Sequence, residues 1–179
     1  MAGKKIIRSI LAEGDRRSVG RVDEVVDLVR LHPKEVVRLV ECLWNEDPCI
    51  CMRAADALEK ISREHPVLLQ AYKAQLLALA AETTQQEVRW HLALMIPRLR
   101  LTISECRRVA ELLQRYVEDR SSIVNTFAMQ GLSDLTRQDA TLRPMVLELL
   151  RALTRSGTPA MRARGRILLG QMEAERRTD

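Results

Sequence analysis

Residues 47–61 read DPCICMRAADALEKI, and the spacing of their apolar residues recurs along the chain. Counted from Ile50, apolar or small residues stand at offsets of 4, 7, 8 and 11 residues. The same offsets hold from three later starting points, Val88, Val124 and Met161. This spacing corresponds to one face of an α-helix, so the sequence predicts four similar helices. We call them A helices, and their starting points lie 38, 36 and 37 residues apart.

A second repeated pattern lies between the A helices. It consists of apolar pairs spaced 37, 36 and 37 residues apart: Leu39-Val40, Leu76-Leu77, Leu112-Leu113 and Leu149-Leu150. A second set of helices, the B helices, therefore alternates with the A helices. Because neither helix of a pair can bury its apolar stripe alone, the repeated units are expected to stack.

Residues that begin and end helices agree with this alternation. Asp47-Pro48 and Thr158-Pro159 are typical of an N-cap followed by proline in the first turn, and Pro97 is expected to kink or shorten its helix. A helix is expected to begin at Ser104, without a full capping box. The predicted helices are 4–13, 20–31, 33–45, 48–64, 66–82, 85–99, 104–119, 121–137, 141–156 and 159–175.

The composition also favours a folded, helical protein. Of 179 residues, 46% are hydrophobic, which excludes disorder over most of the length. Only 7 glycines and 6 prolines are present, too few for a sandwich of many short strands. The net charge of +5 is unevenly distributed: residues 1–21 carry a local +4 and residues 22–46 a local −3.

Residue types that carry chemistry are scattered. The 4 cysteines contain no CxxC pair, and the 3 histidines lie at no metal-ligand spacing from them. Motifs for nucleophilic catalysis, phosphate binding or zinc hydrolysis are absent. We therefore expect no enzyme activity, catalytic residue, metal or cofactor. Without a signal peptide or an 18-residue apolar run, the protein is expected in the reducing cytoplasm.

The repeated unit resembles the HEAT repeat. The best match is Asp47-Pro48 followed by Ala54-Ala55-Asp56-Ala57-Leu58, and the segments beginning Val88-Arg89 and Met161-Arg162 match next best. Where the family usually has arginine at the second of these positions, this chain has Cys51 and Asn125 in two of the units.

This resemblance implies an all-α fold, a right-handed α-solenoid of about four to five armadillo-like helical hairpins. Residues 1–19 are expected to form a basic N-terminal capping segment. The repeat domain then covers 20–179, with units at about 20–46, 47–83, 84–119, 120–157 and 158–175.

Members of the HEAT family mostly act as protein-binding scaffolds, with B helices on the concave side. We therefore expect a non-enzymatic adaptor that binds another protein or peptide on that face, with no membrane or small-molecule substrate as partner. The candidate partner-binding residues are Arg38, Glu111, Gln114, Arg115, Glu148 and Arg151. Trp44, at the end of a B helix, fits either a groove edge or a staple over the next unit.

Two alternatives stay open. The first is nucleic-acid binding, as in a degenerate relative of the HEAT-like alkylpurine DNA glycosylases. Its candidate contact residues are Lys4, Lys5, Arg8, Arg162 and Arg166. The second, a lyase or chaperone for a chromophore-carrying protein, rests on analogy of fold alone.

Overall fold

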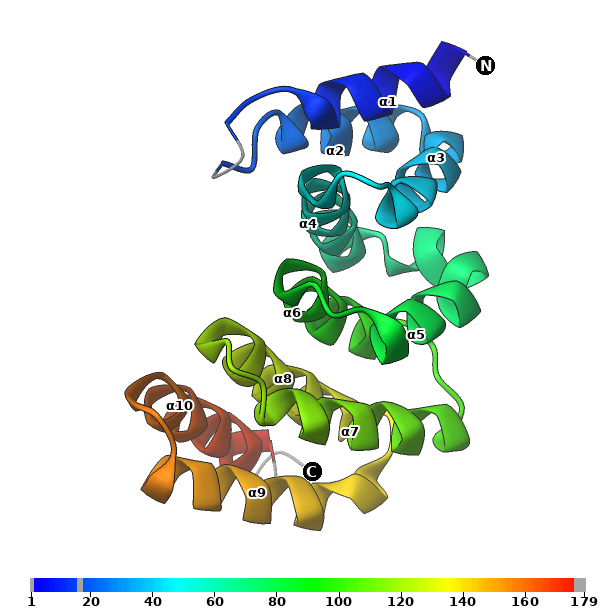
Figure 1. Cartoon of the computed structure of the whole chain (residues 1–179). Helices are drawn as coiled ribbons and strands as arrows, with labels where there is room; N and C mark the ends of the chain where they lie inside the picture. Colours follow the sequence, from blue (N-terminus) through cyan, green and yellow to red (C-terminus); the bar gives the residue numbers. More distant parts are fainter. Residues whose placement is uncertain (1, 16–17, 176–179) are drawn as a thin grey trace. The chain divides into compact units, whose positions relative to one another are not determined.

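The computed structural model describes residues 2–15 and 18–175, and every regular element in these ranges is helical (Figure 1). The α-helices are α1 (Ala2–Ala12), α2 (Val22–Leu31), α3 (Val36–Glu41), α4 (Pro48–Glu64), α5 (Lys73–Glu82), α6 (Gln86–Met95), α7 (Ile103–Val117), α8 (Ser122–Leu135), α9 (Arg143–Ser156) and α10 (Pro159–Glu175). Short 3-10 helices extend them: η1 (Pro33–Glu35), η2 (Cys42–Trp44), η3 (Pro66–Tyr72), η4 (Ile96–Arg98) and η5 (Ala140–Leu142). The all-α prediction is confirmed for this part of the chain.

The chain divides into two compact units, with the boundary between Leu99 and Arg100. The boundary lies inside the predicted repeat unit 84–119, between its A helix, α6, and its B helix, α7. In the first compact unit α2 precedes the first B helix, and we count it as a further A helix. The helices α2, α4 and α6 pack in succession (Figure 1). The B-helix segments α3 and α5 lie beside them, and α1 packs against α2, α3 and α4.

The second compact unit consists of two helical hairpins. Helix α7 pairs with α8, α9 pairs with α10, and the A helices α8 and α10 pack against each other (Figure 1). Among the described residues, no helix combines the length and the apolar content needed to span a bilayer.

Proline positions explain where the helices deviate from the predicted ranges. B helices begin as 3-10 turns at Pro33 and Pro66, which lack the backbone N–H of a regular first turn. Pro97 has the predicted effect: α6 ends at Met95 and continues as the 3-10 helix η4. The predicted start of α7 at Ser104 is wrong by one residue, because Thr102 is the N-cap and forms a full capping box with Glu105.

Most of the large apolar residues in the two repeated patterns are buried. They include Leu58, Ile61, Leu76, Leu99, Leu112, Leu113, Leu132 and Leu150. Leu77 and Leu149, the partners in two of the repeated pairs, are only half-buried. One member of each of these pairs therefore faces the core, while the other lies at the edge of its B helix.

A buried arginine attaches α1 to the rest of the first unit. The Arg53 side chain on α4 is 1% exposed and donates hydrogen bonds to one backbone carbonyl in the last turn of α1 and to three in the segment joining α1 to α2. The acceptors are the carbonyl oxygens of Leu11, Glu13, Asp15 and Ser18, at 2.7, 2.8, 2.6 and 3.2 Å. The predicted capping segment 1–19 is thereby joined to the first compact unit.

Glycine is required where this segment turns back. Gly20 has φ +56°, in the left-handed region that favours glycine. A Cβ atom there would lie 2.7 Å from the Glu13 carbonyl oxygen and 3.1 Å from the Arg53 guanidinium carbon. The backbone therefore approaches Arg53 as closely as it does because residue 20 lacks a side chain.

Candidate functional site

A groove in the first unit lies between two B-helix segments. It has a volume of about 410 Å³ and lies between α3 with η2 on one side and η3 with α5 on the other. Its lining residues are Val37, Val40, Glu41, Trp44, Tyr72 and Gln75. The groove thus combines apolar walls, two aromatic rings, one carboxylate and one amide.

Helical spacing brings one wall of the groove together. Val37, Val40, Glu41 and Trp44 stand at positions i, i+3, i+4 and i+7, which share a helical face. A neighbouring stripe, which includes Val36 and Leu39, turns into the core. The segment 36–44 therefore carries two adjacent apolar stripes, and one of them faces the groove.

The groove stripe is accessible to a partner. Trp44 is 50% exposed and Val37 is 37% exposed, whereas Val40 is only 2% exposed and forms the floor. Of the two roles considered for Trp44, the structure favours the groove edge over a buried staple. Large apolar side chains that gather on an accessible, concave surface are typical of interaction sites.

The predicted B-face residues of the first unit divide between two environments. Arg38 is half-buried beside Glu35, with a guanidinium–carboxylate distance of 3.4 Å, and it does not line the groove. Glu41 and Gln75 do line it; they flank the repeated apolar pairs Leu39-Val40 and Leu76-Leu77 and so belong to the exposed columns of the B-helix pattern. None of the residues that line the groove was among the candidate partner-binding residues, and only Trp44 was considered for a groove edge.

In the second unit, the predicted B-face residues form a polar surface. Glu111, Arg115, Glu148 and Arg151 are exposed, and Gln114 is half-buried. Their side chains form no hydrogen bond or ion pair with any residue that the structure describes. Helices α7 and α9 therefore present charged groups that remain available for external contacts.

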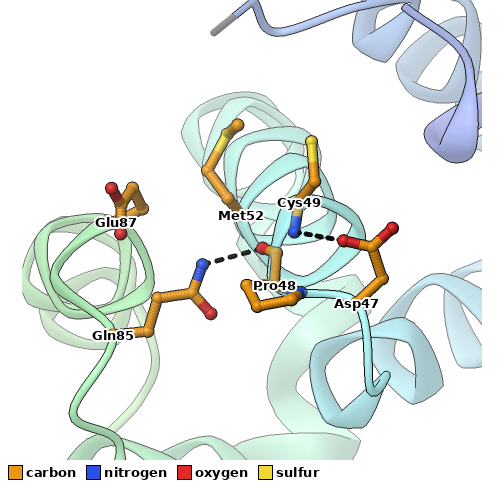
Figure 2. Close-up of a pocket in the computed structure, with 6 residues that line it drawn as sticks. All are labelled: Asp47, Pro48, Cys49, Met52, Gln85 and Glu87. Carbon is orange, nitrogen blue, oxygen red and sulfur yellow. Dashed lines mark hydrogen bonds between the residues drawn. The ribbon is translucent and has the colours of Figure 1, made fainter. Parts of the chain in front are cut away.

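A second cavity, of about 280 Å³, lies where α4 and α6 begin (Figure 2). The Gln85 amide donates to the Pro48 carbonyl at 2.7 Å, and the Cys49 N–H donates to the Asp47 carboxylate at 2.9 Å. Glu87, Cys49 and Met52 complete the wall. Because these hydrogen bonds cap α4 and tie its start to that of α6, we interpret the cavity as a by-product of helix packing.

An ionic network joins the A helices of the first unit. The buried Glu59 carboxylate lies 2.6 Å from Arg63 and 2.8 Å from Arg98, on the segment after α6. Lys60 lies 3.3 Å from Asp56 on α4 and 2.8 Å from Asp23 on α2. Burial opposes ionisation of Glu59, but hydrogen bonds from Arg63 and Arg98 outweigh it and hold its pKa below the ordinary value. An always-ionised, paired carboxylate suits helix packing better than acid–base catalysis.

His91, on α6, faces this network. Burial lowers the pKa of His91 to about 4. The nearby acids Asp56 and Glu59 have the smaller effect of raising this pKa, and the nearby Lys60 and Arg63 lower it. Its Nδ1 atom is buried and finds no hydrogen-bond partner within the described residues, and its ring meets Trp90 edge-on with centroids 5.7 Å apart. His91 is therefore half-buried and neutral at pH 7.

No metal-binding group appears in the described ranges. Within them, His, Cys, Asp and Glu nowhere gather in threes at distances that suit a metal ion. Cys42, Cys51 and Cys106 are buried, Cys49 is half-buried, and none of the four forms a disulfide within the described ranges. The prediction that the protein uses no metal or cofactor stays a prediction.

The structure describes three of the five candidate nucleic-acid contact residues at the level of their side chains. The side chains of Lys4 and Lys5 lie outside what the structure describes, and Arg8 is exposed on α1. Arg162 and Arg166 are exposed on α10, whereas Arg164 turns toward α8 and donates to Gln130 at 2.6 Å. The arginines of α10 are therefore divided between an exposed face and a face that contacts α8.

Comparison of the chain with models of protein families, with curated proteins and with solved structures gives no match. The geometry described above is therefore the basis for the functional argument.

Proposed function

We propose that this chain is a HEAT-like helical repeat protein that binds another protein and has no catalytic activity. In this proposal its helical hairpins are units of a right-handed α-solenoid, and partners bind on the B-helix surfaces. The repeat of about 37 residues supports the family assignment. The packing of α2 on α4, α4 on α6, and α8 on α10 is what such a repeat requires within each compact unit.

The observation that carries the binding proposal is the groove between α3 and α5. It exposes Trp44 and Val37 on a helix whose other stripe is fully used in the core. Half-exposed tryptophan at the edge of an apolar groove is the residue type most enriched among strong contributors to protein–protein affinity. A peptide segment that inserts an apolar side chain would bury this surface.

The polar surface of α7 and α9 supplies a second type of contact in the proposal. The exposed charges of Glu111, Arg115, Glu148 and Arg151 suit electrostatic complementarity with a protein partner. Both signs occur on this surface. A phosphate-tracking surface would instead carry consecutive positive charges, which favours a protein over a nucleic acid as partner.

Nucleic-acid binding and a lyase-type role have weaker support. Exposed Arg8 belongs to the first compact unit, while Arg162 and Arg166 belong to the second, so no basic stripe is assembled within either unit from these residues. The buried Glu59 carboxylate of the first unit is paired with Arg63 and Arg98, which disfavours a role in acid–base catalysis. The lyase or chaperone reading has no observation in its favour beyond analogy of fold.

Site-specific photo-crosslinking tests the proposal. Benzoylphenylalanine replaces Val37 in the groove or, as a matched control, Ile167, which is exposed on α10. In lysate of cells that express the chain, we expect a discrete protein adduct from position 37 that resists nuclease and disappears when Trp44→Ala is added. Equal adducts from both positions, or adducts that nuclease removes, would contradict the proposal.

A further inference from the structure

In α4 and α8, one face of the A helix contacts the following repeat unit. This face includes the residues that lie 6, 9 and 13 positions after the starting points Ile50 and Val124. The contacts made from it include Glu59 with Arg98 at 2.8 Å, Gln130 with Arg164 at 2.6 Å and Arg137 with Glu175 at 2.8 Å. These positions therefore mark the side of an A helix on which the next unit packs.

The corresponding positions of α10 are exposed and uncharged. Counted from Met161, they hold Ile167, Gly170 and Ala174. Ile167 is 52% exposed, and a Cβ atom at Gly170 would meet nothing within 4 Å. The same positions are polar in the two earlier helices: Asp56, Glu59 and Arg63 in α4, and Gln130, Ser133 and Arg137 in α8. A repeat whose outer face stays in water needs polar residues there, so these residues of α10 favour contact with another helix.

Ala160 and Ala163 extend this exposed surface toward the start of α10. With Ile167, Gly170 and Ala174 they are spaced by 3, 4, 3 and 4 residues, which is the spacing of a seam between two packed helices. We call these five residues the outer face of α10. Because four of them are alanine or glycine, a second helix can approach closely, and Ile167 supplies a large apolar group at the centre.

Two charges of opposite sign flank the outer face. Arg166 and Glu173 are exposed, and their side chains form no hydrogen bond or ion pair with any residue that the structure describes. They are 7 residues apart, so they lie on the same side of the helix, about 10 Å from each other along its axis. An antiparallel second copy of α10, related by a two-fold axis between Ile167 and Gly170, brings its Glu173 beside Arg166. The symmetry makes this pair twice, whereas a parallel arrangement sets like charges at the same level.

We propose that the outer face of α10 binds the same face of a second copy of this chain in an antiparallel arrangement. Ile167 of each copy lies against Gly170 of the other, and Arg166 of each copy pairs with Glu173 of the other. One helix from each copy buries an area at the low end of specific interfaces, so the dimer dissociates in the micromolar range. This dimer uses the second compact unit and is independent of the groove in the first.

Sedimentation velocity of the full chain over a series of micromolar concentrations tests this inference. We expect the wild type to pass from monomer to dimer as its concentration rises. Ile167→Glu places a charge at the centre of the face and should weaken the dimer at least about tenfold. Arg166→Glu and Glu173→Arg should each weaken it to a similar degree, because like charges then meet at both symmetric pairs. Arg108→Glu, at an exposed arginine of α7, is the control and should leave the dimer unchanged.

A mixture of the two charge variants tests the antiparallel pairing itself. Arg166→Glu and Glu173→Arg should form a mixed dimer, because opposite charges meet again at both pairs. Benzoylphenylalanine at position 167 should join two copies of the chain, and the mass of this adduct distinguishes it from an adduct with another protein.

Three results would overturn the inference. The first is a wild type that stays monomeric at high micromolar concentration. The second is a dimer that survives Ile167→Glu at an unchanged melting temperature. The third is a mixture of the two charge variants that stays monomeric although each variant melts like the wild type, because the antiparallel pairing would then be wrong.

Discussion

Three different side chains make the same hydrogen bond at one position of the repeat. The Cys51 thiol donates to the Asn45 carbonyl at 3.0 Å, and the Arg89 guanidinium donates to the Thr83 carbonyl at 2.8 Å. The Asn125 amide donates to the Asp119 carbonyl at 2.8 Å. In each case the acceptor lies six residues before the donor. A donor at the second position of the A-helix pattern therefore fixes the loop that enters the helix.

Arg53 is expected to be the most sensitive single polar residue of the first unit. Arg53→Met keeps much of the buried volume but removes the charged donor from the buried Leu11 carbonyl and from the carbonyls of Glu13 and Asp15. A hydrogen bond from a charged donor contributes about 1.5–3 kcal/mol, so we expect the loss of these bonds to lower the free energy of unfolding by about 3–5 kcal/mol. Urea denaturation measures the change.

Arg162→Met is the matched control for this substitution. Arg162 is exposed on α10, so its replacement should change the free energy of unfolding by less than about 0.5 kcal/mol. Equal urea midpoints for Arg53→Met and the wild type would show that the four hydrogen bonds do not secure the segment between α1 and α2.

His91 is expected to make stability depend on pH. Burial lowers its pKa to about 4, whereas the same side chain in the unfolded chain titrates near 6.5. Between these two pKa values the unfolded chain binds a proton that the folded chain does not bind. The stability present above pH 6.5 is therefore lost as the pH falls toward 4. From pH 7 to pH 5 the free energy of unfolding should decrease by about 1–2 kcal/mol. Urea denaturation at a series of pH values measures this slope.

His91→Gln should flatten this pH dependence, because glutamine does not titrate. His65→Gln, at an exposed histidine, should leave the slope as it is in the wild type. A slope that survives His91→Gln would mean that another group takes up the proton.

At the scale of single residues, the sequence predicted which positions of the repeat matter better than it predicted what the side chains at those positions do. Cys51 and Asn125 were departures from the arginine of the HEAT pattern, yet both donate the hydrogen bond that Arg89 donates. Burial raises the pKa of the Cys51 thiol, which keeps it protonated as a donor. The role of Arg53 was not predictable, because its four acceptors lie 35 to 42 residues earlier in the chain.

At the scale of elements, the start of α7 depends on its capping box. The Glu105 N–H donates to the Thr102 hydroxyl at 3.2 Å, and the Thr102 N–H donates to the Glu105 carboxylate at 2.7 Å. Thr102→Ala should lower the free energy of unfolding by about 0.5–2 kcal/mol. Ser104→Ala, at the start that the sequence suggested, should change it by less than about 0.5 kcal/mol. A larger loss from Ser104→Ala in thermal or urea denaturation would favour the sequence-based start.

Replacement by alanine at two glycines of α10 should change the free energy of unfolding in opposite directions. A Cβ atom at Gly165 would lie 2.1 Å from the Thr154 hydroxyl oxygen of α9, which itself donates to Leu150 at 2.7 Å. Gly165→Ala should therefore destabilise the α9–α10 pair by about 1–3 kcal/mol. A Cβ atom at Gly170 meets nothing within 4 Å, so Gly170→Ala should stabilise by about 0.5–1 kcal/mol through helix propensity. Changes of the same sign in the two urea midpoints would contradict the packing described for α10.

Helix positions were largely predictable because proline, capping residues and apolar spacing act locally. The ranges 48–64 and 159–175 agree with α4 and α10 at both ends. Helix type was less predictable: η3 runs from Pro66 to Tyr72 as a 3-10 helix within a range predicted as one continuous helix. The capping box of α7 was missed because the sequence pattern was counted from Ser104.

At the scale of the whole molecule, the binding groove required information that no single segment contains. Its two sides come from residues 37–44 and 72–75, and only folding brings them together. The exposed columns of the B-helix pattern included Glu41 and Gln75, but apolar Val37 and Tyr72 belong to no polar column. In the sequence, the signal that could have located this groove was a second apolar stripe beside the core stripe of residues 36–44.

The central claim is tested most directly with a peptide that is selected on the full chain from a random library displayed on phage, by measuring its affinity for Trp44→Ala. Calorimetric titration compares the wild type, Trp44→Ala and Leu31→Ala, which removes another exposed apolar side chain outside the groove. We predict a Kd at least about tenfold weaker for Trp44→Ala, since truncation of an aromatic anchor costs about 2 kcal/mol or more, and an unchanged Kd for Leu31→Ala. The same Kd for all three proteins, at equal melting temperatures, would contradict the assignment of this groove as the protein-binding site.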